Sequence, residues 1–224
     1  MVCWQKLIEQ SHGSRRLDIV ASAFTNSFNC IAVFHACRPR SVASYYKYGL
    51  RLPNTSKLTQ QAHSIFLSGR FPQITEDIFN QAVNRLQPTT YVRTHVCLDD
   101  RGYFDGAGHY LIYGSEHICA IAANLTNEHT MDYRQVLKLF GKPTIFRLRL
   151  GLRLISESNF NEFVKEVKNH IPRSNRISTM PVSHFTFFLG QNLVPSCVLG
   201  DYHPKVILDP LLRMQRYEYQ GSAA

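Results

Sequence analysis

The sequence lacks the features of a secreted, membrane-spanning or disulfide-rich protein. Its first 18 residues hold no apolar run like that of a signal peptide, and no stretch approaches the roughly 20 apolar residues that cross a bilayer. The six cysteines include no C-x-x-C pair and mostly lie in apolar runs, which is typical of reduced core residues. We therefore expect a soluble, cytoplasmic protein that does not associate with a membrane.

Motifs of several large enzyme classes are also missing. There is no P-loop, no G-x-S-x-G, no H-E-x-x-H and no dinucleotide-binding G-x-G-x-x-G, so nucleotide hydrolysis, esterase and metalloprotease activity are not indicated. The histidines and cysteines lack the paired spacing of a zinc site, so no metal is expected. No repeat, low-complexity tract or long linker divides the chain. We expect one domain over residues 1–224, with its core at about 30–210.

Negative charge is scarce, since 25 Lys and Arg residues face 16 Asp and Glu residues. The segment from residue 19 to residue 75 contains no acidic residue at all but several cations. Such a positive field attracts polyanions, and it also suits the pyrophosphate of a dinucleotide. Arg40, Lys47 and Lys57 are therefore the candidate nucleic-acid-binding residues. A basic solvated face without any ligand is the simpler alternative.

Apolar periodicity and capping residues predict a mixed α+β domain. Expected helices cover 41–48, with Ser41 as N-cap and Gly49 as stop, a segment capped by Thr75, a segment capped by Ser115, and 159–170. Expected strands cover 31–35, 91–98, 109–113, 144–150, 184–189 and 195–199, followed by a polar tail.

Three segments carry candidate chemistry. The first ends a predicted buried strand with Phe34-His35-Ala36, although a lone histidine there is more often structural. The second, 106–116, places Tyr110 and Tyr113 among glycines and ends in Ser115-Glu116, which puts a carboxylate on the first turn of a helix. Strand aromatics that fill the core are the alternative for these tyrosines. The third segment, 185–195, holds two amides, including Gln191, between two expected strands.

In this order the segments resemble the H-Y-E ADP-ribosyltransferases, the superfamily of diphtheria-like toxins and the poly-ADP-ribose polymerases. The stretch 44–50, which ends in Gly49-Leu50, is similar to that superfamily's helix ending in Gly-Leu. The resemblance spans about residues 35–204 through short motifs. It implies an ADP-ribosyltransferase-like fold, a single α+β domain with a split mixed β-sheet flanked by helices, and it implies NAD as a substrate.

The resemblance also implies roles for individual residues. His35 would hydrogen-bond the adenosine ribose, Ala36 would contact the nicotinamide amide through its backbone, and Tyr110 would stack on the nicotinamide. Tyr113 would form a second wall, Ser115 would begin the helix behind it, and Arg38 joins the candidate cofactor-binding residues. The family expects a catalytic glutamate where this chain has Gln191. Either Glu116 supplies the charge, the enzyme needs none, or Gln191 replaces a glutamate; the catalytic candidates are His35, Tyr110, Gln191 and Glu116.

Several functions fit these observations. The leading interpretation is transfer of ADP-ribose to a base of RNA or DNA by a toxin or phage-defence effector, with an antitoxin protein as a candidate partner. Transfer of ADP-ribose to a protein side chain is the second interpretation. It is less favoured, because arginine-directed transferases usually carry Glu-x-Glu and the Glu162 to Glu166 pair has the wrong spacing. A catalytically inert nucleic-acid-binding module is the third. A tRNA 2'-phosphotransferase-like enzyme is the fourth.

Overall fold

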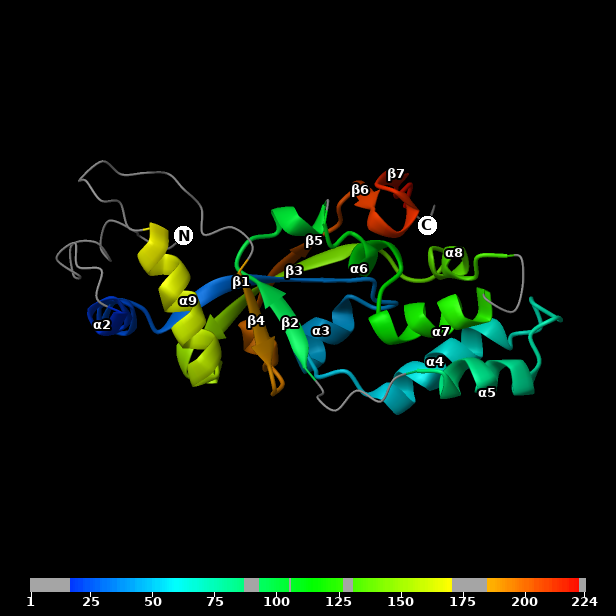
Figure 1. The fold of residues 1–224 in the computed structure, drawn as a ribbon, viewed down its shortest axis with the longest axis horizontal. Helices are drawn as coiled ribbons and strands as arrows, with labels where there is room; N and C mark the ends of the chain where they lie inside the picture. The colour runs from blue at the N-terminus through cyan, green and yellow to red at the C-terminus, as the bar shows by residue number, and fades with distance from the viewer. Residues whose placement is uncertain (1–16, 87–92, 105, 127–130, 171–184, 222–224) are drawn as a thin grey trace.

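A five-stranded sheet forms the centre of the computed structural model, which describes residues 17–86, 93–104, 106–126, 131–170 and 185–221 (Figure 1). Its strand order is β4-β2-β1-β3-β5, and a separate hairpin joins β6 to β7. Every pairing between described strands is antiparallel, so the α+β class is confirmed and the expected mixed sheet is wrong. The strands are β1 (Cys30–Cys37), β2 (Thr94–Cys97), β3 (Thr144–Gly151), β4 (Thr186–Leu189), β5 (Val198–Tyr202), β6 (Val206–Asp209) and β7 (Gln215–Glu218).

The central strand β1 separates two hydrophobic cores. It pairs with β3 along its whole length, from Cys30 opposite Gly151 to Cys37 opposite Thr144. Because side chains alternate along a strand, Ile31 and Val33 face one core while Ala36 faces the other. Helices α2 (Leu17–Ser27) and α9 (Glu157–His170) cover the first core at one end of the molecule.

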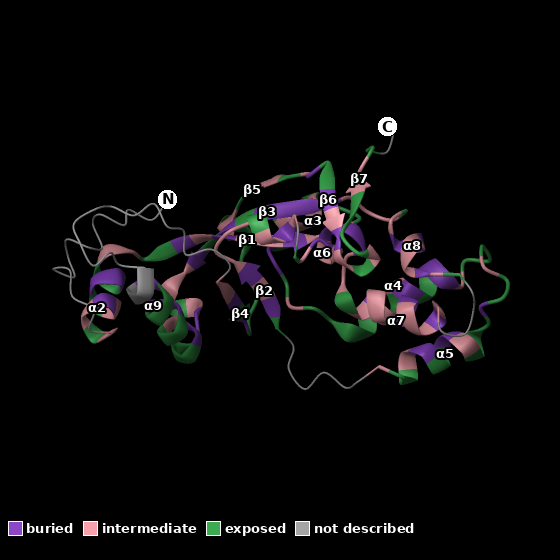
Figure 2. Ribbon diagram, turned by 45° about the horizontal axis from the view of Figure 1, so that its top comes forward, coloured by how far each residue is buried: buried purple, intermediate pink, exposed green. Residues whose placement is uncertain are grey.

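Most of the remaining helices build the second core, at the opposite end of the molecule (Figure 1). Buried residues on these helices alternate with half-buried or exposed ones, so each helix has a buried and a more exposed side (Figure 2). None of the described helices is long and apolar enough to cross a bilayer. These helices are α4 (Thr55–Phe66), α5 (Glu76–Asn84), α6 (His109–Ile112), α7 (Glu116–Thr126) and α8 (Arg134–Leu137).

Several predicted elements are confirmed. Thr75 caps α5 by accepting a hydrogen bond from the Ile78 backbone N–H, and α7 starts directly after Ser115. The expected strand at 144–150 is β3, and the expected helix at 159–170 is α9. Strands β2 and β4 lie within the ranges predicted for them, while Tyr91 and His184 fall outside the described residues.

Three local predictions are wrong. The segment 109–113 is not extended, because Ile112 and Tyr113 donate backbone hydrogen bonds to the carbonyls four residues earlier and so close helix α6. Ser41 does not cap α3 (Ala43–Tyr48), which begins after Val42 without a side-chain cap. The expected strand at 195–199 begins as a single 3-10 turn at 195–197. Gly49 does stop α3, with a φ of 75°.

Candidate functional site

A cleft of about 2310 Å³ brings together side chains from distant parts of the sequence. The end of β1, the loop that follows it, helices α3, α4 and α7, and strands β2 and β4 all contribute to its lining. His35, Ala36, Tyr110, Ser115 and Glu116 all line it, although they come from two sequence segments more than 70 residues apart. The structure therefore gathers most of the residues that the first two motifs proposed.

Positive charge dominates this cleft. Among the described residues that line it, Glu116 is the one carboxylate, and six cationic side chains accompany it. The cations come from the loop after β1, from the turn after α3, from α4, from the C-terminal end of α5 and from the residue before β2, so they surround the cleft from several sides. Such a lining favours an anionic ligand. The six are Arg38, Arg40, Arg51, Lys57, Arg85 and Arg93.

His35 is held in one tautomer by the backbone. Its Nδ1 lies 2.9 Å from the carbonyl oxygen of His95 on the neighbouring strand. A carbonyl oxygen can only accept, so Nδ1 carries the proton and Nε2 is left as an acceptor. Burial lowers the pKa of His35 to about 4, which keeps the ring neutral near pH 7. The ring is therefore suited to accept a hydrogen bond from a ligand hydroxyl.

Tyr110 and Glu116 form a hydrogen-bonded pair at the start of α7. The Tyr110 hydroxyl donates to Glu116 Oε1 at 2.5 Å, and His109 Nε2 lies 3.7 Å from the same oxygen. Pairing with His109, and then the Tyr110 hydrogen bond, lowers the pKa of Glu116 to about 2. The carboxylate is therefore ionised at neutral pH, and its side chain remains 61% exposed. It can present a fixed negative charge to a ligand in the cleft.

Three further residues of this wall were missed in the sequence. His95 orients His35 through its carbonyl, and its ring lies 6.3 Å from Tyr110 and 5.2 Å from Phe188, edge-on to both. The Arg93 guanidinium lies over the Phe188 ring at 5.9 Å. Because side chains alternate along a strand, His95 on β2 faces away from the side on which its neighbour Val96 is buried. Phe188 on β4 likewise faces away from the side on which its own strand neighbours are buried. This alternation in the sequence could have indicated that His95 and Phe188 lie on the outward faces of their strands. The sequence alone does not show that the two strands are neighbours in the sheet.

Arg38 has a structural role. The residue is only 8% exposed, and its guanidinium donates to three backbone carbonyls, those of Phe140, Leu111 and Lys138. It also lies over the rings of two C-terminal tyrosines. These contacts use much of its hydrogen-bonding capacity, so Arg38 ties the end of β1 to the helical layer. Its hydrogen bonds are directed at the protein backbone and not at the space that a pyrophosphate would occupy.

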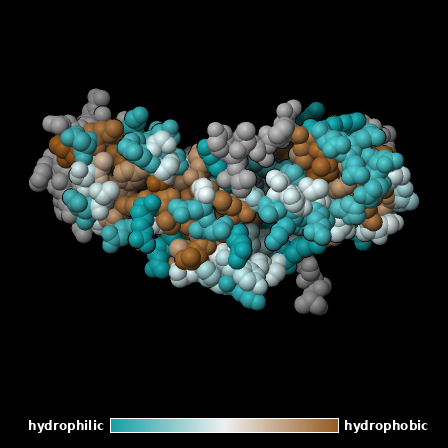
Figure 3. Space-filling view, turned by 90° about the horizontal axis from the view of Figure 1, so that it is seen from below, coloured by the Kyte–Doolittle hydropathy of each residue, from teal (hydrophilic) through white to brown (hydrophobic). Residues whose placement is uncertain are grey.

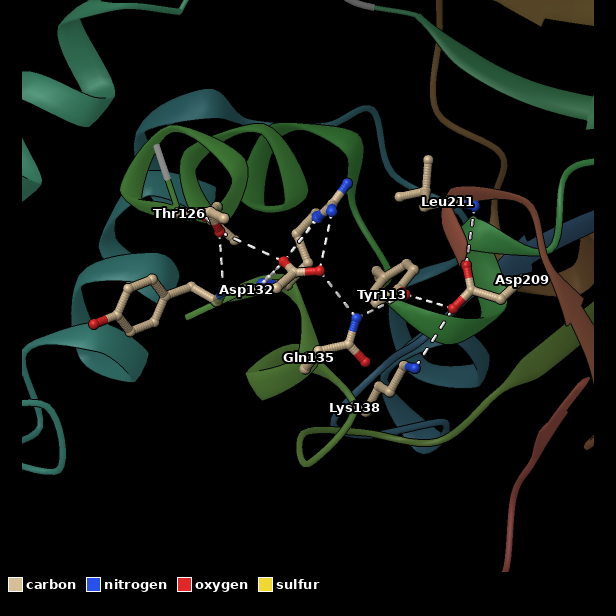
Figure 4. Close-up of polar contacts among 10 residues, drawn as sticks. Tyr113, Thr126, Asp132, Gln135, Lys138, Asp209 and Leu211 are labelled. Carbon is tan, nitrogen blue, oxygen red and sulfur yellow. Dashed lines mark hydrogen bonds and ion pairs between the residues drawn. The ribbon is translucent and has the colours of Figure 1, made fainter. Parts of the chain in front are cut away.

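Tyr113 faces the protein interior and is 4% exposed. Its hydroxyl donates to Asp209 Oδ2 at 2.5 Å and accepts from the Gln135 amide at 3.3 Å, within the polar network drawn in Figure 4. Lys138 Nζ lies 3.5 Å from the same Asp209 oxygen. Burial, and then the bond to Asp209, raises the pKa of Tyr113, so the hydroxyl stays protonated. Tyr113 borders the cleft as part of its supporting wall, and its hydroxyl is committed to this network.

Gln191 is exposed in the loop after β4 and does not line the cleft, whereas the next residue, Asn192, does. The Asn192 side chain accepts a hydrogen bond from the Leu52 backbone N–H at 2.7 Å. This loop packs tightly on the turn after α3, because a Cβ added to Gly49 would lie 1.9 Å from the Leu193 carbonyl oxygen. Gln191 is therefore not among the described residues that line the cleft, whereas His35, Tyr110 and Glu116 are.

The candidate nucleic-acid-binding residues divide into two groups. Arg40 and Lys57 are exposed at the lining of the cleft, and the Arg40 guanidinium lies over the Phe140 ring. Lys47 is exposed on α3 outside the lining, with its Nζ over the Tyr48 ring. In the view of Figure 3, hydrophilic side chains cover most of the end of the molecule formed by α4 and α5. Within the described part of the chain, no cluster of three metal-ligating side chains occurs.

No family model, curated protein or solved structure matches this chain.

Proposed function

We propose that this chain is an NAD-dependent ADP-ribosyltransferase that modifies a nucleic acid. The observation that carries the proposal is the meeting of His35, Tyr110 and Glu116 in one cleft whose described lining holds six cations and a single carboxylate. An aromatic ring, a neutral hydrogen-bond acceptor, a fixed anion and surrounding cations match the parts of NAD: a flat nicotinamide ring, ribose hydroxyls, a developing cation and a pyrophosphate.

The reaction breaks the bond between the ribose C1' and the nicotinamide nitrogen. The bonding electron pair leaves with nicotinamide, which becomes neutral, and positive charge develops on the ribose ring. A nucleophilic atom of the acceptor then bonds to C1' and releases its proton to solvent or a base. A fixed negative charge beside the developing cation stabilises the transition state more than the ground state, which is the condition for acceleration.

Each residue has a part in that reaction. Nε2 of His35 accepts a hydrogen bond from a ribose hydroxyl, and the backbone at Ala36 offers its polar groups to the nicotinamide amide. Tyr110 provides a ring face for stacking and holds Glu116 with its hydroxyl. The ionised Glu116 supplies the negative charge. Arg40 and Lys57 counter the charge of the pyrophosphate or of the acceptor's phosphates.

A labelling experiment tests this proposal. The protein is incubated with NAD labelled in its adenylate half, in separate reactions with RNA, single-stranded DNA, duplex DNA and a protein mixture, and both nicotinamide release and label transfer are followed. We expect nicotinamide release, with label entering a nucleic acid. Label that enters only protein would support a protein acceptor instead, and binding of nucleic acid without NAD consumption would support an inert binding module.

Two histidine variants provide the matched comparison. His35→Ala should abolish most NAD turnover. His203→Ala removes another half-buried histidine whose Nδ1 lies 3.0 Å from a carbonyl, that of Pro143, but His203 does not line the cleft. Its turnover should follow the parent. Equal turnover in the two variants would contradict the proposed role of His35.

A further inference from the structure

Phe188 presents a large aromatic ring to the cleft and is 41% exposed. Its strand neighbours Phe187 and Leu189 are fully buried, so the alternation of β4 fixes the outward direction of the ring. The Phe188 backbone N–H donates to the side chain of Asn159, which is itself only 5% exposed, at 2.8 Å. The backbone that carries the ring is therefore held in place, and the ring is partly exposed at the cleft.

The neighbours of Phe188 connect it to the proposed reaction centre. The His95 ring lies edge-on to Phe188, at 5.2 Å between centroids, and the same residue fixes His35 through its carbonyl. Arg93 lies over the Phe188 ring at 5.9 Å and carries a positive charge to this side of the cleft. An aromatic platform and a cation thus occur together, on the β2 and β4 side, next to the residues assigned to NAD.

We infer that Phe188 and Arg93 form the acceptor subsite, where an unpaired nucleobase of a polynucleotide stacks on the Phe188 ring and Arg93 contacts the adjoining phosphate. This inference rests on the proposed transferase activity and names the form of its acceptor. Aromatic rings bind bases of any sequence by stacking, and cations beside them follow the phosphate backbone. A base inside a duplex is already stacked and paired, so it must first be unpaired to use the ring.

The charge of the cleft favours a nucleic acid over a peptide as this occupant. Among the described residues that line the cleft, five cationic side chains besides the internally bonded Arg38, against one carboxylate, complement a phosphate backbone. An acidic peptide would gain from the same cations, but it offers no flat ring at every residue for Phe188. The subsite is therefore assigned to single-stranded nucleic acid, without preference between RNA and DNA.

Binding measurements without NAD provide the first test. Labelled single-stranded RNA, the matching DNA, the duplex and an oligonucleotide with abasic positions are titrated with protein, and fluorescence anisotropy is recorded. The parent should bind single strands more tightly than duplex and lose affinity for the abasic strand. Phe188→Ala should weaken binding to the normal strand by about tenfold, within the range of stacking on one aromatic ring, and should no longer distinguish the abasic strand. Phe188→Trp should retain parental behaviour.

The control is Tyr46→Ala, which removes a ring of similar exposure, 43%, on α3 and outside the residues that line the cleft. It should bind every oligonucleotide as the parent does. Arg93→Gln should reduce the dependence of affinity on salt, because one phosphate contact is lost. Parental affinity of Phe188→Ala for the normal strand, or stronger binding of duplex by the parent, would overturn the inference.

Turnover measurements separate this inference from the activity on which it rests. In the presence of NAD and a single strand, Phe188→Ala should lower the ratio of label transfer to NAD hydrolysis about tenfold. A parent that stacks single strands as described but consumes no NAD would support the subsite and refute the transferase. A parent that consumes NAD and transfers label only to protein would overturn the subsite and leave the transferase standing.

Discussion

Glu116 allows the proposed chemistry to be tested by a change of charge alone. Glu116→Gln keeps the size of the side chain and its ability to accept the Tyr110 hydrogen bond, but removes the negative charge. Two unit charges about 4 Å apart interact by about 4 kcal/mol at an effective dielectric constant of about 20. Because the side chain is 61% exposed, solvent screens part of that interaction. We therefore expect turnover to fall about 10²-fold, the lower end of what one preorganised electrostatic group supplies.

The measurement is the steady-state rate of NAD consumption, with kcat and KM determined separately. Loss of a group that acts in the transition state lowers kcat while KM changes little. Glu76→Gln is the matched control, because Glu76 also begins a helix, pairs with a histidine, His63, and is 60% exposed, but does not line the cleft. Its kcat should stay within about twofold of the parent value, as expected for a surface substitution.

Gln191→Glu completes the comparison, since the family resemblance places a glutamate at this position. The structure puts Gln191 outside the cleft lining, so the added carboxylate should leave kcat nearly unchanged. A kcat of Glu116→Gln equal to that of the parent, or an increase of about 10²-fold in Gln191→Glu, would refute the assignment of the catalytic charge to Glu116.

Two further predictions concern pH and surface charge. The folded-state pKa of His35, about 4, lies below its ordinary value of 6.5, so the unfolded chain binds more protons and stability falls as the pH drops from 6.5 towards 4. The free energy of unfolding, measured with urea at pH 7 and near pH 4, should therefore fall by about 3 kcal/mol less in His35→Gln than in the parent. An equal fall in the two proteins would contradict the prediction. Lys47→Glu should weaken oligonucleotide binding and spare NAD affinity, whereas Arg40→Glu and Lys57→Glu, in the cleft lining, should weaken both. Equal effects of the three on NAD affinity, measured by calorimetry, would count against this division.

Local sequence signals predicted several elements correctly. Thr75 before an apolar stripe identified α5, and the regular stripe through Phe163 and Val167 identified α9. The alternation of β3 was equally clear, because its inward residues are fully buried and Arg147 and Arg149 are exposed. The first two motifs also located five residues of the cleft correctly, namely His35, Ala36, Tyr110, Ser115 and Glu116.

Contacts between distant segments could not be predicted in the same way. The tautomer of His35 depends on the carbonyl of His95, 60 residues away, and only strand pairing brings the two together. Tyr110 and Tyr113 were expected on a strand, where their odd spacing would send them to opposite faces. In the structure Tyr110 lies in helix α6 and Tyr113 directly after it. Their hydroxyls still have different partners, because that of Tyr110 donates to Glu116 and that of Tyr113 donates to Asp209. Gly108 permits this helix to approach β6, because a Cβ there would lie 2.2 Å from the Leu208 carbonyl oxygen.

The polar composition of the C-terminal region did not predict the buried contacts that this region makes. Residues beyond 199 were expected to form a polar tail, yet they finish β5 and build the β6–β7 hairpin. Asp209 is a charged residue in this stretch, but its side chain is 1% exposed and accepts from the Tyr113 hydroxyl and the Leu211 N–H, with Lys138 Nζ 3.5 Å away. Through Tyr113 it joins the hairpin to the wall of the cleft.

Asp209→Asn should therefore cost far more stability than its position in a polar stretch implies. The change leaves Lys138, whose side chain is 20% exposed, without its carboxylate and places an amide N–H₂ among groups arranged to donate. Breaking a buried pair costs about 3 to 5 kcal/mol, and partial exposure of the lysine favours about 3 kcal/mol. Glu218→Gln breaks the exposed pair with Arg216 on the same hairpin and should cost less than about 1 kcal/mol. Urea unfolding measures the loss in free energy of unfolding for both variants. Equal losses would mean that Asp209 does not hold the hairpin against the wall of the cleft.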